Sequence, residues 1–436
     1  MAGNRDTQTD FSQSSGWYAT VPAPGPAKRL SGRQNADWVV VGAGLTGLAS
    51  ARRLGELQPG ARIILLESFR VGYGASGRNA GFIIDAPAYT PQFDVEYNSR
   101  LMRLFRAGRS QLETLVSHHN IDCEWSPHGH ISAVTTPERG AKLSNISRSL
   151  DAVGDEYEWL DSDALREFLG TSFYSTAIRL PRTVLVNPAA LCRGLGETLP
   201  ANVEIYEDSP VRRVAGGEPV TVECADGSVS AKGVMLTTNV FAQDIGFLED
   251  KLIPILLYAS LSRPLNDAEQ ATMTGAREWG VTPGAAGGST VRRTASNRMF
   301  LRSVVRHSRE FRVTDSLRAS LRETHRALLV KRYPMLSGIQ MEHTWGGVVC
   351  MTRNYASAFG RIEPGVFSSI GYNGVGLARG TISGELLAEH VLGGDSELMT
   401  DAMALADPNR LPPKLFVDLG VKARLVWSRL RHRGED

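Results

Sequence analysis

The sequence predicts an α/β fold that contains a Rossmann-type nucleotide-binding domain. Three observations lead to this prediction. A strand-length apolar run at 38–41 leads into spaced glycines and a helical pattern at 45–57. A second glycine-rich segment, at 371–376, directly precedes another helical pattern. Between the two, strand and helix patterns alternate without a repeat of solenoid period.

The first unit starts with a buried strand at Trp38–Val41 and continues into Gly42, Gly44 and Gly47. In this G-x-G-x-x-G spacing, Gly42 permits a tight turn, Gly44 leaves room for a pyrophosphate, and Gly47 allows the helix to pack closely. The phosphates then lie at a helix N-terminus, which favours negative charge. Glu67 ends the next apolar run, where a carboxylate accepts hydrogen bonds from ribose hydroxyls. The unit predicts a dinucleotide site that fits FAD or NAD.

The loop Gly72–Gly81, GYGASGRNAG, combines small residues with one cation and one amide. Such a loop lets the backbone approach a flat ligand, while Arg78 and Asn79 reach phosphate or ring oxygens. Its GASGRNAG stretch, directly after the ribose acid, resembles the FAD-dependent D-amino-acid-oxidase-like superfamily, and in particular the gamma-glutamylputrescine oxidase branch. The resemblance implies that the cofactor is FAD.

A second match lies near the C-terminus. Trp345–Gly347, then Phe359–Ile362, then Gly371–Gly376 resemble the family's W-x-G, F-G-R and glycine-rich flavin loop. The resemblance implies that the helix starting at Leu377 points its N-terminus at the pyrimidine edge of the flavin, where negative charge develops on reduction. It also gives Val211 the position of the residue whose backbone meets adenine.

The motifs and the resemblance together predict these cofactor-binding residues: Gly42, Gly44, Leu45, Thr46, Gly47, Glu67, Ser68, Gly74, Ala75, Ser76, Arg78, Asn79, Ala80, Gly81, Val211, Thr238, Gly374, Val375 and Gly376.

The resemblance covers about residues 15–430 and implies a Rossmann-type, glutathione-reductase-like FAD-binding domain with an interleaved substrate domain on a mixed or antiparallel sheet. The boundaries we expect are a polar lead-in at 1–35, an FAD-binding domain at 36–105, 185–245 and 345–400, a substrate domain at 106–184 and 246–344, and a tail at 401–436 that packs on the body.

Periodicity and turn signals predict the remaining elements. We expect helices at 92–120 and 137–169, strands at 128–134, 233–236 and 251–261, a hairpin pairing 202–214 with 220–224, and a second hairpin at 291–305.

Five arginines lie in or beside the second hairpin. Strand alternation places Arg292, Arg298, Arg302 and Arg306 on one face and Arg293 on the other, provided that no bulge shifts the register. Such a cluster can hold an anionic substrate end if several side chains point inward. For most of them a solvated basic hairpin is the favoured interpretation.

Amino-acid oxidases of this superfamily hold the substrate carboxylate with a strand arginine, which glycine oxidases carry four residues after the tryptophan. Here that position is Val349, which predicts weak binding of an α-carboxylate. Arg353 is a less favoured substitute. Some relatives attach FAD through a cysteine in this region, and for Cys350 we favour an ordinary buried thiol over a covalent link.

The resemblance implies oxidation of a small amine by hydride transfer to flavin N5, giving an imine that hydrolyses to an aldehyde. Oxygen or another acceptor then takes the electrons. The alternatives are an amino-acid or N-methylamino-acid oxidase, and a nucleotide-binding regulatory protein. No catalytic residue is certain, and the candidates are His343, Trp345, Arg292 and Arg302.

Because 48 basic and 46 acidic residues nearly balance in 436 residues, the composition implies neither a nucleic-acid nor a general membrane-surface role. The use of cysteine favours a cytoplasmic, reduced protein. Apolar stretches fall short of the roughly twenty residues that cross a bilayer. Residues 1–35 lack the apolar core of a signal peptide. The four scattered cysteines argue against a metal site or a redox disulfide. His128 and His130, which share a strand face, are expected to pack or to lie at the surface.

Overall fold

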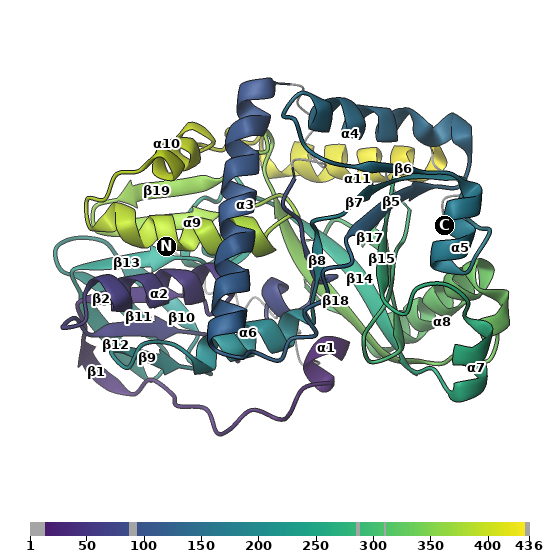
Figure 1. Ribbon diagram of the computed structural model, residues 1–436. Coiled ribbons are helices and arrows are strands. Elements are labelled where there is room, and N and C mark those ends of the chain that lie inside the picture. The colour runs from purple at the N-terminus through teal and green to yellow at the C-terminus, as the bar shows by residue number, and fades with distance from the viewer. Residues whose placement is uncertain (1–13, 87–93, 285–287, 309–310, 432–436) are drawn as a thin grey trace.

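The computed structural model describes residues 14–86, 94–284, 288–308 and 311–431, which form two main sheets joined side by side (Figure 1). The nucleotide-type sheet lies on the left of that view and a larger mixed sheet on the right. The α/β prediction is confirmed. Within the described residues, no helix is long and apolar enough to cross a membrane.

The left-hand sheet has six strands in the order β19-β20-β13-β2-β3-β9. All pairings are parallel except β19 with β20 at the edge. Its strands are β2 (Trp38–Val41), β3 (Ile63–Leu66), β9 (Val203–Tyr206), β13 (Gly233–Leu236), β19 (Ala358–Glu363) and β20 (Val366–Ile370). Because both faces are covered, β2 and β3 are apolar and buried at every position, as parallel strands require.

Helices cover one face of this sheet and a small sheet covers the other. The helices are α2 (Leu45–Leu57), α3 (Val95–His118), α6 (Pro188–Glu197), α9 (Leu377–Val391) and α10 (Glu397–Ala404). The small sheet, in the order β1-β12-β11-β10, contains β1 (Gly32–Asn35), β10 (Val211–Ala215), β11 (Val220–Cys224) and β12 (Gly227–Ala231). Alternate side chains of β2 and β3 therefore enter two different cores.

The right-hand sheet has eight strands in the order β18-β14-β17-β16-β15-β5-β7-β6. They are β5 (His130–Val134), β6 (Glu158–Leu160), β7 (Thr176–Leu180), β14 (Ile253–Pro264), β15 (Trp279–Pro283), β16 (Thr290–Arg293), β17 (Arg298–Arg306) and β18 (Met341–Met351). Only β15 with β5 pairs in parallel, so the sheet is mixed, as expected.

The remaining elements cover this sheet or connect the two halves. The helices are α1 (Gly16–Ala19), α4 (Ala141–Asp151), α5 (Ser162–Leu169), α7 (Asp267–Thr272), α8 (Asp315–Arg332) and α11 (Lys414–Arg431). Short 3₁₀ turns occur at η1 (Ala75–Gly77), η2 (Pro137–Gly140), η3 (Asn239–Ile245) and η4 (Pro334–Leu336), and β4 (Phe82–Ile83) pairs with β8 (Val184–Leu185).

Several boundaries differ from the sequence expectations. The helical segment expected at 137–169 is interrupted by β6. In the hairpin expected to pair 202–214 with 220–224, β10 pairs antiparallel with β11 as predicted, whereas β9 pairs with β3 in the six-stranded sheet. The boundary expected between 105 and 106 falls inside α3, and the one between 344 and 345 falls inside β18, which pairs with β14 along its length. Composition cannot locate such a boundary, because a continuous helix and a continuous strand run through the two positions.

The described part of the polar N-terminal lead-in expected at 1–35 contains two ordered elements. Residues 16–19 form α1, where Trp17 is 1% exposed, and 32–35 form β1, which pairs in parallel with β12. Trp17 packs against Phe300 and Trp345 on the eight-stranded sheet. Trp17 and Tyr18 both belong to this buried cluster, and only the tertiary structure shows what they pack against.

A bulge in β17 changes the expected face of one arginine. The register with β14 shifts at Val304, which has a left-handed backbone (φ 53°). Beyond this point the side chains change faces, so Arg306 lies over the Tyr258 ring, on the face opposite to Arg302. Arg292 and Arg293 are only 2% and 4% exposed, so the favoured interpretation of a solvated basic hairpin is wrong for both.

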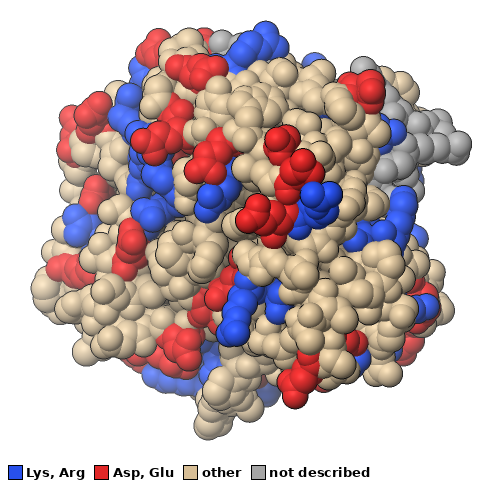
Figure 2. Space-filling model, turned by 45° about the vertical axis from the view of Figure 1, so that its right-hand side comes forward, with Lys and Arg blue, Asp and Glu red and all other residues tan. Residues whose placement is uncertain are grey.

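On the face shown in Figure 2, basic and acidic side chains are intermingled, and neither sign forms a continuous field. This agrees with the near balance of 48 basic and 46 acidic residues in the sequence.

Candidate cofactor and active site

An elongated cavity of about 380 Å³ runs from the carboxyl ends of β2 and β3 to the strand β18. Seven chain segments line it, within residues 41–46, 66–69, 74–79, 209–211, 237–245, 348–350 and 369–377. The cavity therefore begins at the nucleotide sheet and ends where that sheet meets the eight-stranded sheet. Ligands of open α/β sheets bind at the carboxyl ends of their strands, so its position is the one expected for a dinucleotide.

The three fingerprint glycines act through different contacts. Gly42 has a left-handed φ of 101°, and a Cβ on Gly47 would lie 1.8 Å from the Gly42 carbonyl oxygen. These observations confirm the tight turn and the close helix packing. Gly44 is the N-cap of α2, and the N–H of Leu45 donates to the Ser76 hydroxyl at 3.0 Å. The helix N-terminus and Ser76 both line the cavity, a setting that favours a phosphate.

Glu67 lies in the cavity wall at the end of β3, as predicted. Its two carboxylate oxygens accept from the backbone N–H groups of Ala43 (2.7 Å) and Phe69 (3.0 Å). Desolvation raises the pKa of Glu67, and these two hydrogen bonds oppose the rise. The carboxylate is thereby fixed beside the first turn, where it has lone pairs left for ribose hydroxyls.

Two polar atoms in the cavity wall are buried without a hydrogen-bond partner among the described residues. They are Oγ1 of Thr238 and Oδ1 of Asn239, at the start of η3. Buried polar groups in native proteins are nearly always satisfied by protein, water or ligand. Together with the α2 N-terminus and Glu67, these two atoms fit a polar dinucleotide in the cavity.

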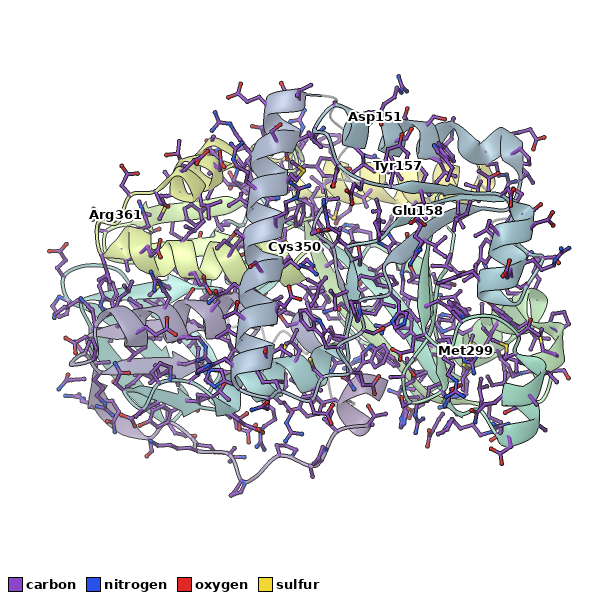
Figure 3. The ribbon with its side chains drawn as sticks, viewed as in Figure 1. Asp151, Tyr157, Glu158, Met299, Cys350 and Arg361 are labelled. Carbon is purple, nitrogen blue, oxygen red and sulfur yellow. The ribbon has the colours of Figure 1, made fainter. Side chains whose placement is uncertain are left out.

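At the far end, β18 and the loop before α9 face each other across the cavity. Val348, Val349 and Cys350 line it from β18, and Tyr372 and Gly374 line it from the loop. The Tyr372 hydroxyl lies 3.2 Å from the Thr46 hydroxyl of the first fingerprint, so both glycine-rich motifs meet here. Cys350 lies near the middle of the molecule, where the two halves join (Figure 3). This end of the cavity is suited to an isoalloxazine ring.

The helix α9 starts directly at the cavity. Its N-cap is Gly376, and its first residue, Leu377, lines the wall. The unpaired N–H groups of the first turn and the helix dipole favour an anion there. The position therefore fits the pyrimidine edge of a flavin, as the resemblance implies.

The loop at 72–81 is held rigidly from outside the cavity. Four successive carbonyls each accept from a distant side chain: Gly77 from Ser15 (2.7 Å), Arg78 from Trp345 (3.1 Å), Asn79 from Trp17 (2.8 Å) and Ala80 from Arg292 (2.5 Å). The Asn79 side chain bonds to the loop's own backbone, at Ala75 and Ser76. With its carbonyls engaged on the outside, the loop presents its opposite edge to the cavity.

The four catalytic candidates lie outside the cavity lining. Arg292 is buried between the rings of Trp17 and Phe82, so it is a structural cation and not a substrate ligand. Trp345 is 2% exposed and holds the loop, and His343 lies beneath Gly16 of α1.

Arg302 has a different environment. It is partly exposed and lies in a cross-strand row with Trp345, Ala259 and Thr290. Its guanidinium donates to the Thr290 hydroxyl at 2.6 Å. Trp345 and Val349 lie on the same face of β18, so Arg302 shares the sheet face that reaches the cavity.

Fourteen of the nineteen predicted cofactor residues line the cavity. The other five are Gly47, Arg78, Ala80, Gly81 and Val375, which are not among its lining residues. The Arg78 guanidinium points away, donating to the carbonyls of Tyr73 and Gly346, and burial lowers its pKa to about 10. It connects the loop to β18 from outside the cavity lining.

Most of the wall formed by η3 carries no motif in the sequence. Phe241, Asp244 and Ile245 line the cavity, as do Phe69, Ser209 and Pro210 near its nucleotide end. The segment 239–245 has neither a strand nor an amphipathic helical period, so no pattern marked it. Tyr372 and Asn373, by contrast, lay within a motif that had been recognised and were identifiable from it.

The structure also gives the positions of Arg353, His128 and His130, for which the sequence left alternative roles open. Arg353 is exposed and outside the lining of the cavity. His128 contacts the Ser126 hydroxyl, and the buried His130 contacts Thr183. In the described part of the chain, no cluster of His, Cys, Asp or Glu is arranged to hold a metal, and the four cysteines are free thiols.

Comparison with known proteins adds three findings. A family model described as FAD dependent oxidoreductase (DAO) matches residues 37–390. The chain is similar to the gamma-glutamylputrescine oxidoreductase of Escherichia coli, with 27% identity over 403 residues, covering 88% of this chain and 90% of that protein. It is also 26% identical over 407 residues to a probable oxidoreductase, OrdL, of Haemophilus influenzae, covering 89% and 90%.

Among solved structures, a glycine oxidase from Geobacillus kaustophilus superimposes with a TM-score of 0.71 at 18% identity, covering 84% of this chain and 96% of that one. This likeness shows that the fold is shared.

Proposed function

The chain belongs to the FAD dependent oxidoreductase (DAO) family, and on that premise we propose that it oxidises the carbon–nitrogen bond of a small amine with no carboxylate on the reacting carbon. FAD is the cofactor of the family. When bound, it accepts a hydride equivalent from the carbon that bears nitrogen. The substrate then leaves as an imine, which water hydrolyses to an aldehyde and an amine or ammonia.

The observation that carries this proposal is the position of Val349. It lies in the cavity wall on β18, opposite Gly374 of the flavin loop and beside its strand partner Ile255. This is the place that corresponds to the carboxylate-binding arginine of glycine oxidases. An apolar side chain there offers no hydrogen bond to an α-carboxylate, whereas an arginine fork offers two.

The charged side chains of the cavity wall also favour a substrate without an α-carboxylate. Among the described residues that line it, Glu67 and Asp244 are the carboxylic acids, and none is lysine, arginine or histidine. An α-carboxylate in this site would be desolvated without a cation to compensate it. A neutral amine carries no such cost, so the proposed substrate reacts as the free amine and its turnover rises with pH.

A substrate carboxylate at a distance remains compatible with the site. Arg302 lies on the cavity face of the eight-stranded sheet, two strands from Val349 and about 13 Å along the strand direction. A long amine with an acid at its far end, such as a gamma-glutamylated polyamine, spans that distance. The name of the Escherichia coli relative agrees with this class of substrate.

We further propose a cytoplasmic location, because four free thiols suit a reducing compartment. The electron acceptor is oxygen or a second redox partner. Comparing turnover with oxygen and with an artificial dye acceptor in the same preparation distinguishes these two.

The test is to mix the holoprotein anaerobically with a panel of amines and amino acids and to follow the flavin absorbance at about 450 nm. Bleaching by carboxylate-free amines or distal-acid amines, with glycine, sarcosine and D-amino acids inert, supports the proposal. Bleaching by α-amino acids contradicts it and indicates an amino-acid or N-methylamino-acid oxidase. A yellow protein that none of the panel bleaches indicates a flavin-binding role without amine oxidation.

A further inference from the structure

The helix α11 (Lys414–Arg431) carries an unusual concentration of exposed apolar side chains. Among the described residues, ten large hydrophobic side chains are exposed, and five of them belong to this one helix. They are Leu415 (66% exposed), Phe416 (64%), Leu419 (58%), Val426 (55%) and Trp427 (57%). Exposed apolar groups are ordinary when scattered singly, but a contiguous set marks an interaction site.

The exposed residues form one stripe along the helix. At 100° a residue, Leu415, Phe416, Leu419, Gly420, Ala423, Val426 and Trp427 fall within an arc of about 140°. We call these seven residues the outer stripe. Lys422 flanks one edge and Arg424 the other, both exposed and without an ion-pair partner among the described residues. The outer stripe is thus an apolar band between two cations.

The stripe does not result from a poorly docked helix, because the opposite face is firmly attached. Val417 is buried, and Asp418 accepts from the buried His307 ring at 2.7 Å. The second ring nitrogen of His307 lies 2.8 Å from the Pro254 carbonyl oxygen of β14. The helix therefore has two apolar faces, one on the body and one directed outward.

The charge of α11 is strongly biased. Its sequence holds five basic residues and one acid, so its formal positive charge exceeds the +2 of the whole chain. The one acid, Asp418, faces the body and is paired with His307. An apolar stripe bordered by lysine and arginine on an amphipathic helix is the composition of helices that lie in the interface of anionic membranes.

A second copy of the chain fits this surface less well. An 18-residue helix is about 27 Å long, and a strip of that length and one helix width offers about 270 Å². A stable protein–protein interface needs about 800 Å² from each partner. Two copies of this helix would also bring like charges together, and lysine is depleted from interfaces. A bilayer surface requires neither a matching shape nor a large area.

From these observations we propose that the outer stripe of α11 docks the protein on the surface of an anionic membrane, with Phe416, Leu419 and Trp427 among the acyl chains and Lys422 and Arg424 at the headgroups. The proposal goes beyond the oxidation reaction and is independent of it. It concerns attachment to one face of a bilayer and not a span, in agreement with the absence of any membrane-crossing helix among the described residues.

The experiment is flotation of the flavin-loaded, full-length protein with vesicles of phosphatidylcholine alone or mixed with phosphatidylglycerol. We expect binding to the mixed vesicles and little to phosphatidylcholine alone, with a decrease as salt is raised, because headgroup attraction is screened. Binding should fall about tenfold or more in the double variant Phe416→Ser/Leu419→Ser and in Lys422→Gln/Arg424→Gln.

The matched control is Leu57→Ser, which removes an exposed leucine (41% exposed) at the end of α2, in the other half of the molecule (Figure 1). It should leave vesicle binding unchanged, and all variants should retain FAD and their thermal midpoint. Two results overturn the proposal: wild-type protein that stays unbound with mixed vesicles, or equal binding by Phe416→Ser/Leu419→Ser. A third result also overturns the proposal: light scattering shows a dimer, and only the Phe416→Ser/Leu419→Ser variant dissociates it. That result would assign the outer stripe to self-association.

Discussion

The indole Nε1 of Trp17 donates to the carbonyl oxygen of Asn79 at 2.8 Å, which joins the N-terminal segment to the loop that borders the cofactor cavity. Ser15 makes a similar bond to Gly77, and the Tyr18 hydroxyl donates to Val71 at 3.3 Å. The N-terminal segment thus holds the ten-residue loop at two points and the residue before it at a third. The cofactor site depends on a segment that lies outside the matched family region, residues 37–390.

Trp17→Phe should weaken FAD binding while leaving the fold in place. The substitution keeps the stacked ring against Phe300 but removes the donor to Asn79. Loss of one such hydrogen bond corresponds to about 1 kcal/mol, or roughly a fivefold weaker affinity. FAD titration of the apoprotein measures it. The exposed Trp159→Phe is the control, and equal affinities for the two variants would contradict a role of the bond.

Glu67→Gln should lower FAD affinity by roughly tenfold to a hundredfold. A charged acceptor contributes about 1.5–3 kcal/mol to a hydrogen bond, and the amide removes that charge with little change in size. The N–H groups of Ala43 and Phe69 would also lose a charged partner. The control is Glu56→Gln, an exposed position of α2 outside the cavity lining. Tight binding retained by Glu67→Gln would place the ribose elsewhere.

Val349→Arg should shift the substrate preference toward α-amino acids. The variant introduces the missing fork in the cavity wall, where wild-type protein has an apolar side chain. Amine turnover should fall, and glycine or sarcosine should begin to bleach the flavin. Val349→Leu keeps the site apolar and should retain the amine preference. Loss of amine turnover in both variants without a gain for amino acids would show only that the position is sensitive to volume.

FAD should be released completely when the protein is denatured. Cys350 lines the cavity, so its position alone permits a contact with the flavin. Burial raises the pKa of its thiol, however, and a protonated thiol is a poor nucleophile. Gel filtration in denaturant, with absorbance read for both flavin and protein, shows whether the flavin separates from the polypeptide. Flavin that stays with the wild-type polypeptide and leaves Cys350→Ser would demonstrate a covalent link.

Glu385→Gln should raise stability above neutral pH. Burial raises the pKa of Glu385 on α9 to about 7, and its Oε1 has no hydrogen-bond partner among the described residues. Since the folded-state pKa lies above the ordinary value, the protonated carboxyl is favoured on folding. Its contribution is fully present below the ordinary pKa and is lost as pH rises through about 7.

Urea unfolding at a series of pH values tests this, with Glu167→Gln, at an exposed position of α5, as the control. The wild-type slope of stability against pH should flatten in Glu385→Gln alone. An unchanged slope would mean that Glu385 is ionised in the folded protein at neutral pH.

The local elements of the nucleotide site were predictable from sequence because their signals are short-range. The strand at Trp38–Val41 and the helix at Leu45–Leu57 have the bounds that were predicted, and the buried strand at 233–236 is also confirmed. Glycine spacing and apolar periodicity determine these elements within a few residues of chain. Fourteen of the nineteen residues predicted to bind the cofactor line the cavity.

The sequence by itself therefore determined the fold class, the dinucleotide fingerprint and the family. Only the tertiary structure decided that Arg292 is buried under Trp17 and that Arg78 turns to β18. Only the tertiary structure shows that the strand register shifts at Val304, which moves Arg306 to the other face of the sheet. The direction of a long side chain depends on the solvation and hydrogen bonds offered by residues hundreds of positions away. A periodic pattern specifies a face of a strand or helix, but it carries no information on what covers that face.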